Sequence, residues 1–258
     1  MEIYIIPIVA IAASFLTFFS GFGLGTLLLP TFAIFFPIEA AIAMTAIVHF
    51  SNNLFKIGLV YKNINYSILL KFGLPAIIFS FIGAELLKTI SNDQLYFTYS
   101  LFDFVIKTTV VKIVIAFTMI IFAILELFPK IENNINFGKN AMSIGGALSG
   151  FFGGLSGHQG ALRSAVLIKL NLEKFQYIAT GVAIACFVDV ARLTVYSSNI
   201  QKTINESNFQ LIAITTFAAF LGAFIGNKML KKIEIKFIKY IVGVSLILIS
   251  ISILIGLI

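Results

Sequence analysis

The chain has 258 residues, of which 59% are hydrophobic and only 11% are charged, and its mean hydropathy is +1.04. Soluble domains carry about 25% charged residues, so this composition excludes a soluble globular protein and predicts an integral membrane protein. A net charge of +7 would suggest nucleic-acid binding in a soluble protein, but here it indicates Lys and Arg in cytoplasmic loops, and we expect no nucleic-acid partner.

Apolar segments of membrane-spanning length, roughly 20 residues each, follow one another along the chain. We therefore expect an all-α polytopic protein that forms one integral membrane domain. The first segment follows Glu2 and has no small-residue cleavage site, so we expect it to be retained rather than removed as a signal peptide. The connection 91–109 is aromatic and is expected to lie along the membrane interface as an amphipathic segment. The apolar segments are 3–36, 40–60, 66–87, 110–128, 141–170, 175–196, 209–230 and 237–258.

Glycines interrupt two of these segments. The first break carries Gly21, Gly23 and Gly25 at alternate positions, which disfavours a helix. A second glycine-rich break occupies 153–160. Backbone groups freed inside the hydrocarbon are tolerated only against other protein or a wet cavity. Paired breaks in the two halves of a chain indicate the binding site of a transporter.

The two halves of the chain resemble each other. An offset of 135 residues places Gly25 on Gly160, and an offset of 143 places Gly83 on Gly226 after an insertion in the second half. The breaks and the segment lengths also coincide, which indicates a duplication. The expected repeats are residues 1–130 and 131–258.

The orientation of the repeats depends on whether the broken segments span the membrane. If they do, the repeats are parallel and the loop Lys and Arg residues, with Lys56 and Arg192 counted among them, divide ten against seven. If they are re-entrant hairpins, the repeats are inverted and the division is twelve against five, which fits the positive-inside rule better. One straight helix over 3–36 would measure about 50 Å, against a hydrocarbon core of roughly 30 Å. We favour inverted repeats, each a broken segment or hairpin followed by about three transmembrane helices. The parallel arrangement stays open, since 3–19 is long for a re-entrant arm.

Arg163 follows the second break within an apolar segment. An intramembrane Arg costs at least about 2.5–3.5 kcal/mol, so it normally faces a cavity or a partner. In the first turn of a helix its guanidinium could join free N-terminal amides in holding an anion. The alternative is a structural pair with Asp189 or with carbonyls freed by the break.

Polar side chains gather in the break and in the segment after each break. His158 and Gln159 could donate hydrogen bonds to a ligand, with His158 carrying a coupling proton, or they could satisfy the freed backbone. His49 and Asn53 are four residues apart and share a helix face, where interhelical hydrogen bonding is the alternative to a ligand. The predicted substrate-binding residues are Gly21, Gly23, Gly25, Thr26, Asn52, Asn53, Ser156, Gly157, His158, Gln159, Gly160 and Arg163.

The second-half counterpart of the His49 segment carries Asp189 and Arg192, which can pair along the helix because they are three residues apart. The alternative for Asp189 is a proton or Na⁺ site. The candidates for binding a coupling ion are therefore His49, His158 and Asp189. The single Cys186 excludes an intrachain disulfide and a multi-cysteine metal site, and we expect no metal and no cofactor.

The glycine-rich stretch 21–25, followed by Leu-Leu-Leu-Pro at 27–30, resembles a segment of the sulfite exporter TauE/SafE family of membrane transporters. The second copy at 150–160 is similar to it, and 45–61 looks like that family's second helix. The resemblance implies secondary transport of small anions, notably sulfite, sulfoacetate and other organosulfonates, across a bacterial inner membrane. The chain departs from the family pattern by carrying His158, Gln159 and Arg163, which leaves the particular substrate open.

The sequence thus predicts a secondary transporter that binds sulfite, an organosulfonate such as sulfoacetate, or a related carboxylate at the midplane between the breaks. The alternative is an intramembrane enzyme acting on lipid or peptide, with His49 or His158 as general base. No nucleophile–base–orienter set is evident, so we expect no enzyme. A passive channel is a third alternative. The expected surroundings are the lipid bilayer, and the sequence leaves open H⁺ or Na⁺ coupling and homo-oligomerisation.

Overall fold

The computed structural model describes residues 1–20, 23–92, 96–101, 104–128, 138–203, 206–229 and 235–257. Helices dominate it, which confirms the all-α class. The α-helices are α1 (Glu2–Ser20), α2 (Gly25–Ala33), α3 (Ile38–Val60), α4 (Tyr66–Asn92), α5 (Val110–Leu127), α7 (Ala141–Ser156), α8 (Gly160–Leu167), α9 (Lys174–Thr203), α10 (Glu206–Lys228) and α11 (Ile235–Leu254). The short elements are the 3₁₀ turns η1 (Tyr61–Asn63), η2 (Gly138–Asn140) and η3 (Ile168–Leu170), and the strands β1 (Tyr96–Leu101) and β2 (Phe104–Thr109).

Four of the described helices are long and apolar enough to cross a bilayer, as expected of a multi-pass membrane protein. They cover Tyr66–Ser91, Val110–Leu127, Lys174–Ser197 and Asn208–Lys228. Helix α3 has 23 residues but is not among them, because polar side chains in its second half lower its hydropathy. These side chains are His49, Asn52, Asn53 and Lys56, and all four are buried.

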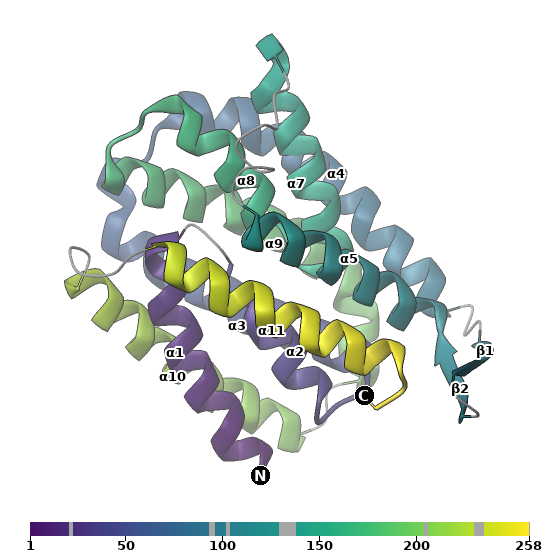
Figure 1. The fold of residues 1–258 in the computed structure, drawn as a ribbon. Coiled ribbons are helices and arrows are strands. Elements are labelled where there is room, and N and C mark those ends of the chain that lie inside the picture. The colour runs from purple at the N-terminus through teal and green to yellow at the C-terminus, as the bar shows by residue number, and fades with distance from the viewer. Residues whose placement is uncertain are drawn as a thin grey trace.

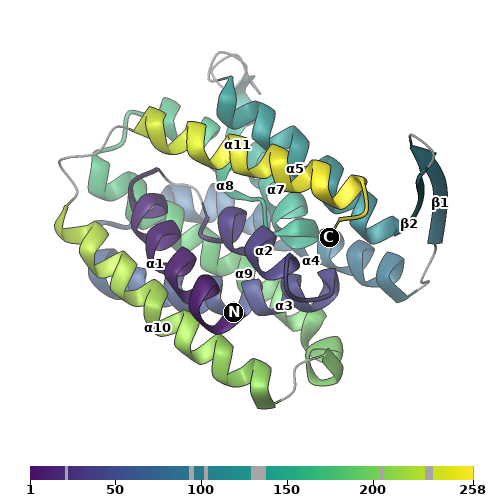
Figure 2. The same ribbon diagram turned by 60° about the horizontal axis from the view of Figure 1, so that its bottom comes forward.

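The broken helices pack against the opposite half of the chain. Helix α1 runs along α10, α7 runs along α4, and α5 lies beside α11 (Figures 1 and 2). Helices α3 and α9 pack on each other. They connect the pair α1–α10 with the pair α4–α7, because α3 also contacts α10 and α9 also contacts α4. The two helices that carry the predicted polar side chains therefore meet inside the bundle.

Glycines bring α7 into backbone contact with α4. A Cβ atom on Gly150 would lie 2.1 Å from the carbonyl oxygen of Ala76, which is closer than real Cβ atoms come. Small residues at a four-residue spacing let membrane helices approach closely enough for dispersion and Cα–H···O contacts, since apolar side chains gain nothing by leaving lipid. The sequence analysis did not identify this spacing. The facing pairs are Gly146 with Phe72, Gly150 with Ala76, and Gly154 with Ser80.

The connection between α4 and α5 forms a hairpin rather than a single amphipathic segment. Strands β1 and β2 pair antiparallel, with Tyr96 opposite Thr109, and they project from the helical body (Figures 1 and 2). Aromatic and β-branched residues favour strands, which explains the pairing of this stretch. The hydroxyl oxygen of Thr109 then accepts a hydrogen bond from the backbone N–H of Lys112, at 3.3 Å, and so caps α5.

Two of the charges that the sequence analysis placed in loops lie inside the bundle. Lys56 in α3 is 2% exposed and Arg192 in α9 is 1% exposed. When Lys56 and Arg192 are left out, the loop Lys and Arg residues on the two sides of the membrane number eleven and four for inverted repeats. For parallel repeats they number ten and five. The loop charges therefore no longer distinguish the two arrangements, and the inverted arrangement stays a prediction.

We expect Gly150→Ala to destabilise the protein by about 1–3 kcal/mol, because its methyl group would overlap the backbone of α4. The matched control is Gly58→Ala in α3, where a Cβ would meet nothing within 4 Å. The measurement is thermal unfolding of both variants in detergent. Equal melting temperatures for the two variants would contradict the close packing of α7 on α4.

Candidate functional site

The structure confirms that both glycine-rich stretches interrupt a helix. Helix α1 ends at Ser20 and α2 begins at Gly25, whereas Gly21 lies outside the described residues. Helix α7 ends at Ser156 and α8 begins at Gly160. Gly157 has φ of +80° and its N–H donates to the carbonyl of Gly153 at 2.9 Å, which is the left-handed ending that favours glycine.

The two breaks touch each other. A Cβ on Gly25 would lie 3.7 Å from the carbonyl oxygen of Gly157, within ordinary contact distance. Side-chain hydroxyls donate hydrogen bonds to some of the backbone carbonyls at the breaks. The hydroxyl of Thr26 donates to the carbonyl of Gly23, and the hydroxyl of Ser149 donates to the carbonyl of Gln159, each at 2.8 Å. These side chains satisfy part of the backbone that the interruptions free within the interior.

Beside the breaks, the buried carboxylate of Asp189 accepts from four side chains. Its Oδ2 lies 2.7 Å from Nδ1 of His49 and 3.1 Å from Nδ2 of Asn53. Its Oδ1 lies 2.8 Å from Nη2 and 3.0 Å from Nε of Arg192, and 3.4 Å from Nε2 of Gln159. The predicted pair along α9 is confirmed, and the network also ties α9 to α3 and to the second break.

The hydrogen-bond pattern fixes the orientation of His49. A carboxylate only accepts hydrogen bonds, so Nδ1 carries the hydrogen that it donates to Asp189, and Nε2 is the basic nitrogen. The Nε2 edge lies against Gly23, where a Cβ would come within 2.7 Å of it. Nδ2 of Asn53 lies a long 3.4 Å from Nε2. Glycine at position 23 therefore leaves room for the imidazole.

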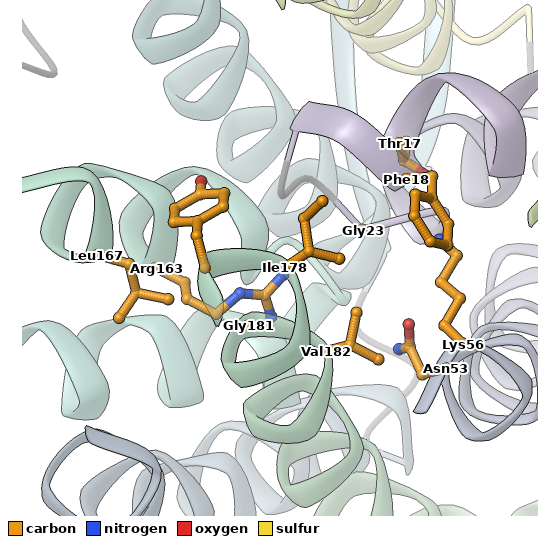
Figure 3. Close-up of a pocket in the computed structure, with 11 residues that line it drawn as sticks. Thr17, Phe18, Gly23, Asn53, Lys56, Arg163, Leu167, Ile178, Gly181 and Val182 are labelled. Atoms are coloured by element: carbon orange, nitrogen blue, oxygen red, sulfur yellow. The ribbon is translucent and has the colours of Figure 1, made fainter. Parts of the chain in front are cut away.

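A cavity opens next to this network, with about 350 Å³ of empty space when its mouth is counted. It lies between α1, the first break, α3, α8 and α9. Figure 3 shows Arg163 on one side and Asn53 and Lys56 on the other. The described residues that line it are Thr17, Phe18, Gly23, Asn53, Lys56, Arg163, Leu167, Tyr177, Ile178, Gly181 and Val182.

Two buried basic side chains line the cavity. Arg163 is 3% exposed and its Nη1 donates to Oε1 of Gln159 at 3.2 Å. Nζ of Lys56 lies 5.6 Å from the centre of the Phe18 ring, and no carboxylate of the described residues lies within ion-pair distance of it. The buried hydroxyl of Thr17 has no hydrogen-bond partner in the described part of the chain. Two buried cations and a hydroxyl around one space are suited to a small anion.

The structure brings some of the predicted substrate-binding residues into the cavity and leaves others outside it. Gly23, Asn53 and Arg163 line it. Asn52 points instead toward α1, where its Oδ1 accepts a hydrogen bond from Ser14 at 3.1 Å. The predicted residues that the structure describes outside the cavity lining are Gly25, Thr26, Asn52, Ser156, Gly157, His158, Gln159 and Gly160.

His158 lies apart from the Asp189 network. Its Nδ1 is 3.0 Å from the hydroxyl of Ser156, and its ring stacks on Phe122 with centroids 5.7 Å apart. Its Nε2 is buried without a partner in the part that the structure describes. Of the two histidines, only His49 contacts a carboxylate among the described residues.

The sequence analysis missed Lys56, Thr17 and Tyr177 as cavity residues. Lys56 was counted as a loop charge although it lies three residues after Asn53 within an apolar segment. The rule that an intramembrane charge faces a cavity or partner applies to Lys56 as it does to Arg163, so a usable signal existed. Thr17 and Tyr177 gave no comparable signal, because hydroxyl side chains are common in apolar helices.

A protein-family model described as "Sulfite exporter TauE/SafE" matches residues 6–253, which is nearly the whole chain. A comparison with curated proteins gives no match.

We expect Asp189→Asn to destabilise the protein by about 3–5 kcal/mol, because it leaves the buried Arg192 charge without its counter-ion. The matched control is Glu85→Gln, which removes a carboxylate from the exposed pair with Lys88 and should cost less than about 1 kcal/mol. Thermal unfolding in detergent measures both. A small effect at Asp189 would mean that the network contributes little to the fold.

Proposed function

The chain belongs to the sulfite exporter TauE/SafE family, so it is a multi-pass membrane transporter of anions and not an enzyme, and we propose that the cavity beside the two breaks is its anion-binding site. The proposed substrate is a small oxyanion: sulfite, an organosulfonate such as sulfoacetate, or a related carboxylate. The observation that carries the proposal is the pair of buried cations, Lys56 and Arg163, on opposite sides of the cavity.

Each cation has a distinct part in binding. The planar guanidinium of Arg163 can donate two parallel hydrogen bonds to two oxygens of a sulfonate, sulfite or carboxylate. Lys56 supplies a compact charge from the facing helix. The buried hydroxyl of Thr17, which has no hydrogen-bond partner among the residues that the structure describes, and the amide of Asn53 add neutral donors. In a site shielded from water these contacts are stronger than at a surface, and they replace the hydration that the anion loses.

The remaining walls of the cavity favour a substrate with an apolar part. Phe18, Leu167, Ile178 and Val182 present hydrocarbon to the same space. A carbon-bearing sulfonate can place its charged end on the cations and its carbon on these side chains, whereas sulfite uses only the charged part. We therefore infer that organosulfonates bind at least as well as sulfite.

We further infer that residues 1–130 and 131–258 are inverted repeats whose rocking exposes the cavity to each side in turn. The packing supports the division into two repeats, because equivalent glycines lie on the broken helix of the other half. A Cβ on Gly83 would lie 2.0 Å from the carbonyl oxygen of Phe151 in α7. A Cβ on Gly226 would lie 3.0 Å from Cβ of Phe18 in α1.

We expect sulfite, methanesulfonate and sulfoacetate to raise the melting temperature of the detergent-purified protein, because a ligand at 100 times its dissociation constant stabilises by about 2.7 kcal/mol. Lys56→Gln should abolish this shift. Without anion the variant should be at least as stable as the wild type, since one of two neighbouring buried cations is gone.

The control for this experiment is Lys62→Gln, which removes an exposed lysine from the turn after the same helix. It should keep the full anion-induced shift. The same variants are then compared for flux of labelled methanesulfonate in proteoliposomes. A Lys56→Gln protein that binds and transports like the control would refute the assignment of the site.

A further inference from the structure

We propose that His49 is the proton-binding site of this transporter and that it takes up its proton together with the anion. This inference rests on the proposed function, since it concerns the coupling of the anion cavity to the Asp189 network. Histidine is the side chain whose unperturbed charge changes between about pH 5 and 8, and His49 is fully buried beside the cavity.

Two side chains connect the cavity with the Asp189 network. Asn53 lines the cavity and donates to Oδ2 of Asp189, which also accepts from His49. Gln159 accepts from Arg163 through its Oε1 and approaches Oδ1 of Asp189 with its Nε2. An anion bound to Asn53 or Arg163 therefore lies one or two contacts away from Asp189. Asp189 in turn orients His49 through its hydrogen bond with Nδ1.

The first break leaves the basic nitrogen of His49 close to the cavity. Gly23 lines the cavity, and the space where its side chain would be lies 2.7 Å from Nε2. Nδ1 is occupied by Asp189, so a proton arriving from the cavity would bind at Nε2. The imidazolium would then remain paired with the carboxylate through Nδ1.

The charges around the site decide the sign of the coupling. In the described part of the bundle, the basic side chains nearest His49 are Lys56 and Arg192, with Arg163 next to Lys56, against the one carboxylate of Asp189. A proton on His49 adds to this positive excess, and a bound anion offsets it. Binding free energies are reciprocal, so the anion strengthens proton binding and the proton strengthens anion binding. Such mutual stabilisation produces co-transport, whereas exchange of the two requires competition.

The other helices packed on α3 add no further charge near His49. Helix α2 contains no titratable side chain. Helices α1 and α10 carry theirs near their ends, at Glu2, Tyr4, Glu206 and Lys228.

The donor set favours a proton over Na⁺. A hard cation needs several oxygen ligands. Both oxygens of Asp189 already face N–H donors, from His49 and Asn53 on one oxygen and from Arg192 on the other. The oxygens of Asp189 are therefore engaged by N–H donors and do not form the set of oxygen ligands that Na⁺ would need.

The test measures methanesulfonate binding to the detergent-purified chain from about pH 5 to 8, because this anion stays ionised throughout. We expect the affinity to rise as the pH falls, by up to about tenfold per pH unit, and to level off at low pH. Calorimetric titrations in two buffers of different ionisation enthalpy should give up to one proton taken up per anion. Affinity that does not change with pH would overturn the coupling and leave the anion site standing, whereas no binding at any pH would overturn both.

His49→Gln should bind methanesulfonate with an affinity that no longer depends on pH, since Gln keeps a donor toward Asp189 but takes up no proton. The matched control is His158→Gln, which removes the other buried histidine and should keep the pH dependence. A pH dependence that persists in His49→Gln would overturn the assignment.

A measurement that needs no variant completes the test. In wild-type proteoliposomes containing a pH-sensitive dye, a gradient of methanesulfonate should move protons in the same direction as the anion. Anion flux without proton flux, or protons moving in the opposite direction, would overturn the proposal.

Discussion

The buried carboxylate of Asp189 is the contact on which the interior of this protein depends. A lone charge inside a membrane protein is costly, so it persists only when donors surround it. Here the donors come from α9 itself, from α3 and from the break between α7 and α8. One side chain thus holds together elements that are far apart in the chain, and it fixes the second break against the helix that carries His49.

This network can form only because the helices around it pack closely. In lipid there is little hydrophobic gain from bringing helices together, so van der Waals and backbone contacts must supply the stability. Glycines provide them, as where Gly150 of α7 meets Ala76 of α4 and Gly222 of α10 meets the carbonyl of Ile11 in α1. The glycine content therefore serves two purposes: some glycines break helices, and others let unbroken helices touch.

The cavity next to this network has the opposite arrangement of charge. Asp189 is surrounded by donors, whereas Lys56 and Arg163 bring positive charge to a space that contains no described carboxylate. In the proposed function, a bound anion offsets this positive charge, and its release restores it.

The sequence by itself determined the features that depend on local spacing. The membrane class follows from composition, the breaks follow from glycine, and the pair of Asp189 with Arg192 follows from the geometry of one helix. Only the tertiary structure placed His49 against Asp189, 140 residues away in the chain, and Lys56 opposite Arg163. Contacts between helices depend on the distance and the register at which their backbones pack. Both are determined by glycines on one helix that meet residues of another helix. Spacing along one helix cannot reveal which partner helix it meets.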